Sequence, residues 1–336
     1  MRLKLFLLTL IFSIALTRYS NAYEENMPFT SSIVVNSKNG QILQSYYPDR
    51  IIYPASLTKM MTAYVVFGAI KRGVIGLYDK IDKDKYASYG IYRYFGRNEN
   101  VTVYDLLLKM IVNSTNEAAT ILALEVSENI SNFVEMMNDY ARKIKMTKTH
   151  FANPHGLFDK DHFSTARDMA NLSIRLVHDF PNLSQLFGIT DYLSNDDFYE
   201  KTTVIQRKAV GLKGNKTGYV AASGYNIAAW GEYGLNEKIF AVLIGASSKY
   251  DRDRLIMRLI SNSVKEYNII NRKERDSDIN KLMDSAANFF GIDKKKEGRV
   301  VEVEEEDDLG FEIEVKDIND EDKQKINKNS RFYVAR

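Results

Sequence analysis

A short polar segment that opens directly onto an uninterrupted apolar run is the strongest constraint in this sequence. The apolar run covers Met60 to Ile70, and the residues before it read Pro54-Ala55-Ser56-Leu57-Thr58-Lys59. If the run forms a helix, residues three apart share a face, so Ser56 and Lys59 point the same way. A serine hydroxyl becomes a good nucleophile only when a base takes its proton, and a lysine with a lowered pKa can be that base. The pair alone is common on surface helices, so its meaning depends on the rest of the chain.

The composition limits the classes of function. With 336 residues, 45% of them hydrophobic and 27% charged, the chain has room for one large domain or two ordinary ones. The formal net charge of +2 favours neither nucleic acid nor an anionic membrane as a partner. The sequence contains no cysteine, which excludes disulfides, thiolate catalysis and cysteine-ligated metals together.

The N-terminus has the layout of a secretory signal peptide. Arg2 and Lys4 precede the apolar stretch Leu5 to Leu16, and Ser20-Asn21-Ala22 follows with small residues at its first and third places. We therefore expect residues 1–22 to be a signal peptide cleaved after Ala22, with an uncleaved anchor as the alternative. The apolar stretch is shorter than the ~20 residues that span a bilayer. In either case the body of the protein lies outside the cytoplasm, in the periplasm or cell envelope, where ATP and nicotinamide cofactors are not supplied.

Apolar and turn patterns predict an α+β fold with a largely antiparallel sheet. Strands at 32–35 and 41–44 flank a hairpin turn, in which the pair Asn39-Gly40 is expected to supply the positive φ angles. The expected helices cover Ser56 to about Gly73, 106–112, 118–126, 130–144, 166–177 and 254–270, and a later hairpin pairs 225–230 with 238–244.

The composition changes after Asn271. A short amphipathic helix is expected between Ile279 and Phe290, and two segments, 300–304 and 311–315, alternate as edge strands do. Acidic residues dominate the stretch from Glu302 to Asp322. We interpret residues 272–336 as a small solvated appendage that follows a catalytic domain at 23–271.

Two further motifs accompany Ser56 and Lys59. Ser114-Thr115-Asn116 lies between two strongly apolar helices, and Lys216-Thr217-Gly218 precedes a predicted strand. Each tripeptide alone is weak. The three motifs in this order, at a helix start, in a helix–helix loop and on a strand edge, resemble the signature of the penicilloyl-serine transferases.

The residues around the motifs narrow this resemblance. From about Ser31 to Ile270 the chain is similar to low-molecular-mass penicillin-binding proteins, and specifically to serine-type D-alanyl-D-alanine carboxypeptidases. The resemblance implies a transpeptidase/β-lactamase-like fold, an antiparallel sheet flanked by helices. It also implies removal of the terminal D-alanine from peptidoglycan stem pentapeptides, covalent binding of β-lactam antibiotics, and no cofactor or metal. The segments that carry it, besides the motifs, are 55–62, 153–157, 164–170 and 224–226.

The resemblance also implies catalytic roles. Ser56 is expected to be the nucleophile that forms an acyl-enzyme, and Lys59 the general base for its attack. Ser114 is expected to relay the proton to the departing amine, while Asn116 holds the substrate amide and helps to place Lys59.

The remaining expected site residues bind the substrate. Lys216 supplies positive potential, and Thr217 hydrogen-bonds the terminal carboxylate. Gly218 lets the substrate lie against the strand as an added edge strand. The oxyanion hole is expected from the backbone N–H groups of Ser56 and Tyr219. A carboxylate-binding arginine is expected at Arg252, with Arg254 as the competing assignment.

Some segments depart from the pattern of the family. Tyr219 stands where many relatives have histidine, and Ser-Thr-Asn replaces the common Ser-Gly-Asn. The tyrosine-rich stretch from Tyr86 to Gly96 does not resemble the usual pattern of the family at this place. We expect it to be a loop that packs its aromatic side chains on the domain. The alternative is that it forms one wall of a binding cleft. The C-terminal part lacks the clear amphipathic helix that ties relatives to the membrane, although peripheral membrane contact is still expected from this region.

Four other functions were weighed. A Ser-His-Asp hydrolase needs a nucleophile elbow, Gly-x-Ser-x-Gly, which is absent. A class A β-lactamase needs a Glu-x-x-x-Asn element between Asn116 and Lys216, and none is convincing there. A non-catalytic penicillin-binding sensor would keep the fold without turnover. The fourth alternative is metal binding, with His155, His162, Asp159 and Asp161 as ligands. These four residues are more simply interpreted as surface turn residues.

Overall fold

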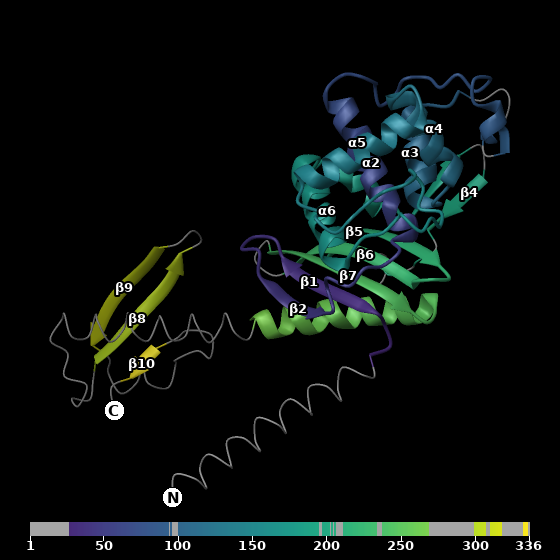
Figure 1. Cartoon of the computed structure of the whole chain (residues 1–336). Coiled ribbons are helices and arrows are strands. Elements are labelled where there is room, and N and C mark those ends of the chain that lie inside the picture. The colour runs from purple at the N-terminus through teal and green to yellow at the C-terminus, as the bar shows by residue number, and fades with distance from the viewer. Residues whose placement is uncertain are drawn as a thin grey trace, which may run out of the picture. The chain divides into compact units, whose positions relative to one another are not determined.

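The computed structural model divides the chain into two compact units, residues 1–264 and 265–336 (Figure 1). The structure describes residues 27–93, 95, 100–192, 200–201, 203, 205, 211–233 and 238–268, and the backbone of 193–194, 197–199, 237, 299–306, 310–317 and 332–334. The expected signal peptide and the helix expected between Ile279 and Phe290 lie outside the described residues. None of the helices in the described ranges is long and apolar enough to cross a membrane.

A five-stranded antiparallel sheet forms the base of the first unit (Figure 1). It joins the two ends of the unit, because the N-terminal hairpin pairs with strands from beyond residue 211. The strands lie in the order β2-β1-β7-β6-β5, so β5 is an edge strand. Their bounds are β1 Ser31–Asn36, β2 Ile42–Tyr46, β5 Leu212–Val220, β6 Gly224–Tyr233 and β7 Glu237–Ala246.

A layer of helices covers one face of this sheet, around α2 (Figure 1). Every residue of α2 from Lys59 to Ala69 is buried, as expected of a helix that is apolar on all sides. A 3-10 turn, η1, leads directly into it. The bounds are η1 Ala55–Thr58, α2 Lys59–Lys71, α3 Val103–Val112, α4 Asn116–Val126, α5 Ile130–Lys143 and α6 Ala166–Asp179.

The alternation of side chains along β1 explains why both faces of the sheet are covered. Ile33 and Val35 belong to the large core beneath the helical layer. Val34 points the opposite way, into a second core that includes Ile256 and Ile260. Those two residues lie on the helix over 249–268, which runs along the other face of the sheet (Figure 1).

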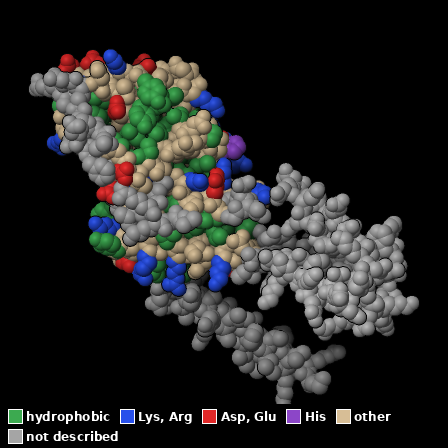
Figure 2. All heavy atoms as spheres, turned by 180° about the vertical axis from the view of Figure 1, so that it is seen from behind, with side chains coloured by type: hydrophobic (Ala, Val, Ile, Leu, Met, Phe, Trp, Pro, Cys, Tyr) green, Lys and Arg blue, Asp and Glu red, His purple; other side chains and the backbone are tan. Residues whose placement is uncertain are grey.

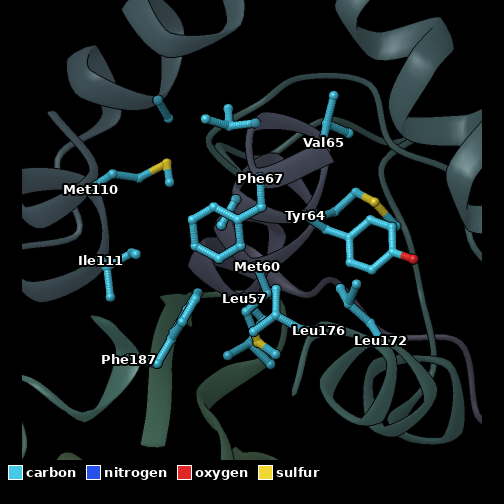
Figure 3. Close-up of a cluster of buried hydrophobic side chains, with 14 of the residues drawn as sticks. Leu57, Met60, Tyr64, Val65, Phe67, Met110, Ile111, Leu172, Leu176 and Phe187 are labelled. Atoms are coloured by element: carbon cyan, nitrogen blue, oxygen red, sulfur yellow. The ribbon is translucent and has the colours of Figure 1, made fainter. Parts of the chain in front are cut away.

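The large core is centred on Phe67 of α2 (Figure 3). Met110 and Ile111 of α3 approach it from one side, and Leu172 and Leu176 of α6 lie near the start of α2 (Figure 3). Leu57 of η1 is also fully buried in this cluster. The η1 turn, which also contains Ser56, is therefore anchored to the core by Leu57.

Most of the expected elements are found, with two differences in the first unit. Of the Asn39-Gly40 pair, only Gly40 has a positive φ, 72°, while the Asn39 side chain accepts a hydrogen bond from the Gln41 N–H. The expected five-residue connection between the strands is found, but the positive φ expected at Asn39 was wrong. The small hairpin β3 (Asp191–Ser194) and β4 (Asp197–Glu200) was not predicted, because four-residue strands are too short to show alternation.

The tyrosine-rich stretch contributes to the core. Tyr86, Ile91 and Phe95 are buried among the core residues, and the segment forms two short 3-10 helices, η2 (Ala87–Tyr89) and η3 (Ile91–Arg93). Tyr89 is exposed. The described part of the stretch therefore packs its aromatic side chains on the domain, which was the favoured interpretation.

The second unit contains a three-stranded antiparallel sheet in the order β10-β8-β9. Its strands are β8 Arg299–Glu306, β9 Gly310–Asp317 and β10 Phe332–Val334. Both alternating segments are strands, but β8 is the central strand rather than an edge strand. The short β10, which pairs with it, lies in a stretch whose three apolar residues gave no strand signal.

The surface of the first unit carries both signs of charge. In the view opposite to that of Figure 1, Lys and Arg side chains lie along the lower edge, and hydrophobic side chains gather in the upper half (Figure 2). This mixture agrees with the small formal net charge of +2.

The position of Phe67 gives a prediction about stability. Replacing this fully buried ring, Phe67→Ala, should lower the free energy of unfolding by about 3–5 kcal/mol, because it removes apolar contacts and leaves a cavity. Tyr250→Ala, at a residue that is 76% exposed, is the control and should change it by less than about 0.5 kcal/mol. Urea denaturation measures both, and equal effects would contradict the assignment of the core.

Candidate active site

Ser56 lies in the 3-10 turn η1, and Lys59 is the first residue of α2. The expectation that both residues belong to one α-helix was therefore wrong. The 3-10 geometry still places them on the same face, because three residues per turn align side chains at i and i+3. The Lys59 Nζ lies 3.0 Å from the Ser56 Oγ. Ala55, directly before the serine, has a φ of 52°, an uncommon value for a residue with a side chain.

The Lys59 amine is completely buried and is surrounded by acceptors. Besides the Ser56 hydroxyl, it donates to the Asn116 Oδ1 at 2.7 Å and to the His155 carbonyl oxygen at 2.6 Å. Burial, and after it the positive charge of Lys216, lower the pKa of Lys59 well below its ordinary value, while Glu117 opposes this shift. The amine is thus held in place and biased towards its neutral form.

Ser114 occupies the connection between α3 and α4 in a left-handed backbone conformation, with a φ of 61°. Its neighbours hold this conformation. The Thr115 N–H donates to the Lys109 carbonyl, and the Tyr192 hydroxyl donates to the Asn113 Oδ1 at 2.7 Å. A non-glycine residue in this region costs energy and is often found at functional sites.

Lys216 connects the second and third motifs. From the edge strand β5, its Nζ donates to the Ser114 Oγ at 2.9 Å and to the Thr217 carbonyl oxygen at 2.9 Å. Burial, and after it the charge of Arg252, lower the pKa of Lys216 to about 7. The chain of contacts Ser56–Lys59–Asn116 and Ser114–Lys216 brings the three motifs to one place.

The two candidate arginines have different environments. Arg252 is 3% exposed, is paired with Asp253, and is close enough for its charge to act on Lys216. The Arg254 side chain is 68% exposed and pairs with Asp251. Of the two, Arg252 is the one whose charge acts on Lys216.

The rest of the Lys-Thr-Gly segment lies beside the serine turn. A Cβ on Gly218 would come within 3.0 Å of the Pro54 carbonyl oxygen and the Ser56 nitrogen. The described neighbour that a side chain at Gly218 would press against is therefore the η1 turn that carries Ser56. Thr217 is half-buried, and Tyr219 is 57% exposed with its ring 4.5 Å from that of Tyr225.

The sequence did not predict that the segment 153–157 holds Lys59 through a backbone oxygen. Gly156 has a φ of 84°, and a Cβ there would lie 1.9 Å from the Ala55 carbonyl oxygen. This close approach presses the 153–157 segment against η1 and aims the His155 carbonyl at the Lys59 amine. The sequence signal was the Asn153-Pro154-His155-Gly156 turn, but nothing in it indicates that a backbone oxygen is the functional group.

His162 was expected on the surface, and this was wrong. It is 2% exposed, with its Nε2 2.7 Å from the Thr58 Oγ1. Its Nδ1 accepts a hydrogen bond from the Ala152 N–H, so the proton is on Nε2 and is donated to Thr58. In the part of the chain that the structure describes, no group of three or more His, Asp or Glu side chains is placed to hold a metal.

The fold is that of penicillin-binding proteins. Penicillin-binding protein 5 from Haemophilus influenzae superimposes with a TM-score of 0.64 at 31% identity, over 73% of this chain and 72% of that one. Penicillin-binding protein D2 from Listeria monocytogenes, solved in a cefotaxime-bound form, gives a TM-score of 0.64 at 25% identity over 71% and 98%.

The sequence comparisons specify the family. Residues 20–248 match the D-alanyl-D-alanine carboxypeptidases of peptidase family S11. The D-alanyl-D-alanine carboxypeptidases DacA of Haemophilus influenzae and DacC of Escherichia coli are each 33% identical, over 66% of this chain. The chain belongs to this family. It spans 58% and 57% of the length of these two relatives.

The buried His162 gives a prediction about pH. Burial, and after it the charge of His155, lower its pKa to about 4, compared with about 6.5 in an unfolded chain. As the pH falls, the unfolded chain takes up the proton first, so the stability that is complete above pH ~6.5 is lost between pH ~6.5 and ~4. His162→Gln should reduce the slope of unfolding free energy against pH in this window by up to about 1.4 kcal/mol per unit.

The control is the same comparison above pH ~7, where neither state changes the protonation of His162 and the slopes of His162→Gln and the wild type should agree. Chemical denaturation at several pH values measures both proteins. A His162→Gln slope equal to that of the wild type between pH ~6.5 and ~4 would contradict the burial of a neutral imidazole.

Proposed function

We propose that this protein is a serine-type D-Ala-D-Ala carboxypeptidase that removes the terminal D-alanine from peptidoglycan stem pentapeptides. The observation that supports this most directly is the 3.0 Å contact between the Ser56 hydroxyl and the buried Lys59 amine. Membership of the carboxypeptidase family supports the substrate class.

In the proposed first step, the Ser56 Oγ attacks the carbonyl carbon between the two D-alanines. Its proton passes to the neutral Lys59 amine as the new C–O bond forms. The lowered pKa of Lys59 supports this role, because an amine that stays protonated cannot accept a proton. The hydrogen bonds to Asn116 and to the His155 carbonyl keep the amine directed at the hydroxyl.

The C–N bond then breaks, and the departing amine of D-alanine needs a proton. The Ser114 hydroxyl is the proposed relay, supported by its contact with Lys216. Water later hydrolyses the acyl-enzyme to the shortened peptide and free Ser56. The proposed oxyanion hole is formed by the backbone N–H groups of Ser56 and Tyr219, and the position of Gly218 beside the Ser56 nitrogen supports it.

The terminal carboxylate of the substrate is the proposed ligand of Lys216, Thr217 and Arg252. Both Lys216 and Arg252 are buried, and the charge of Arg252 acts on Lys216; two basic groups so placed favour an anion. Asn116 is proposed to hold the substrate amide. A β-lactam ring, which also presents an amide carbonyl next to a carboxylate, would acylate the same serine.

The remaining proposals concern the place of action. The pattern at residues 1–22 supports export across the cytoplasmic membrane, and thus action in the periplasm or cell envelope. The division of the chain at residue 264 supports a catalytic domain at 23–271 followed by an appendage. Peripheral membrane contact through that appendage is part of the proposal. The chemistry itself needs no cofactor, because serine and lysine supply nucleophile and base.

The test is release of D-alanine from a pentapeptide that ends in D-Ala-D-Ala, together with labelling by a fluorescent penicillin. Ser56→Ala should abolish both, and Lys59→Ala should lower the acylation rate at least about 10³-fold while leaving the fold intact, since the base is lost. Ser37→Ala, at a serine on an exposed turn, is the control and should retain wild-type rates.

The outcomes separate the candidate functions. Labelling without D-alanine release would indicate a penicillin-binding sensor, and rapid turnover of penicillin would indicate a β-lactamase. If Lys59→Ala unfolds the protein, circular dichroism will show it, and the lysine would then be mainly structural. Full activity of Ser56→Ala would overturn the proposal.

A further inference from the structure

Lys201 is a second buried lysine close to the candidate site, and no role described so far uses it. It follows β4 and is 6% exposed. Its Nζ donates to the carbonyl oxygens of Phe187, at 2.5 Å, and Asn215, at 3.2 Å. Phe187 lies in the 3-10 helix η4 (Leu183–Gly188), and Asn215 directly precedes Lys216 on β5.

The charge state of Lys201 suits this bridging position. Burial, and after it the charge of Lys216, lower the pKa of Lys201 to about 7. A neutral amine has two N–H groups, and two backbone carbonyls are available to accept them. Lys201 therefore ties the edge strand β5 to η4 at the residue next to Lys216.

Thr203 makes an equivalent connection to the second cation. Its Oγ1 donates to the Asp253 Oδ2 at 2.8 Å. The other carboxylate oxygen of Asp253, Oδ1, accepts from the Arg252 Nε at 2.8 Å and lies 2.7 Å from its Nη2. Thr203 is 3% exposed, so the Asp253 carboxylate is fixed from within the protein.

We propose that Lys201 and Thr203 are positioning residues that hold Lys216 and Arg252 in the geometry needed to bind a substrate carboxylate. The inference rests on the proposed function, because it takes these two cations as the carboxylate site. Each residue acts through one partner: Lys201 through the Asn215 carbonyl, and Thr203 through Asp253.

Electrostatics explains why such support is needed. Lys216 and Arg252 repel each other, as the effect of Arg252 on the pKa of Lys216 shows. Asp253 is the acidic partner of Arg252, and a substrate carboxylate would offset the repulsion further. Fixed second contacts keep the two groups in position before the ligand arrives, so that binding does not have to order them.

The experiment compares two thioesters of N-benzoyl-D-alanine with the full-length protein. One carries thioglycolate, with a free carboxylate, and the other its methyl ester. Thr203→Val keeps the shape of the side chain but removes the hydrogen bond to Asp253. It should lower kcat/KM about tenfold for the carboxylate thioester, mainly through KM, and leave the ester within about twofold of the wild type. Lys201→Met should act in the same direction.

Thr190→Val is the matched control. The Thr190 Oγ1 donates a hydrogen bond to the side chain of its neighbour Asp191, at the start of the β3–β4 hairpin that Lys201 follows. It should keep the wild-type preference for the carboxylate. Thermal denaturation checks that each variant is folded, and Thr203→Val carries the test if Lys201→Met is not.

Three results would overturn the inference. In the first, Thr203→Val loses activity equally on both thioesters, as a merely structural role predicts. In the second, Thr203→Val changes the activity on neither thioester. A wild-type protein that shows no preference between the thioesters, or turns over neither, would overturn the proposed carboxylate site and with it the inference. A failure confined to the variants leaves the proposed function standing.

Discussion

The arrangement of the site depends on one buried amine. Lys59 has no exposed surface, and removing a charged ammonium from water is costly unless its partners compensate. Among the contacts described, its three hydrogen-bond partners include no carboxylate, and Lys216 lies close by. These conditions favour the neutral form of Lys59. The Ser56 hydroxyl, which is one of its three partners, is thereby placed beside a base.

Strained backbone also occurs at this site. Ala55 and Ser114 both have positive φ values, and the close approach of Gly156 to Ala55 tolerates no side chain. Such conformations persist because the surroundings fix them. The core does this on one side, through Leu57 and α2, and the edge strand β5 does it on the other, through Gly218. The packing of the fold thus offsets the strain of the backbone conformations that place Ser56 next to Lys59.

The sequence predicted the order of the elements well, because long apolar runs are local signals. It also predicted that the three motifs lie close together, because their combination is specific. It did not predict that Ser56 lies in a 3-10 turn, since the choice between turn types depends on the packing of Leu57 and Gly156. The roles of the His155 carbonyl, Lys201 and Thr203 were also missed. Each depends on contacts between distant segments, and a backbone oxygen has no signature in the sequence. His162 was misplaced for the same reason.

The most direct test of this account is the protonation state of Lys59 itself. An NMR titration of the lysine side-chain carbons, with the Lys59 signal assigned from its absence in Lys59→Arg, measures the pKa of the amine in the folded protein. The account predicts that Lys59 loses its proton well below the ordinary lysine value of about 10.4. An amine that titrates at the ordinary value would contradict it, because Ser56 would then have no base at neutral pH.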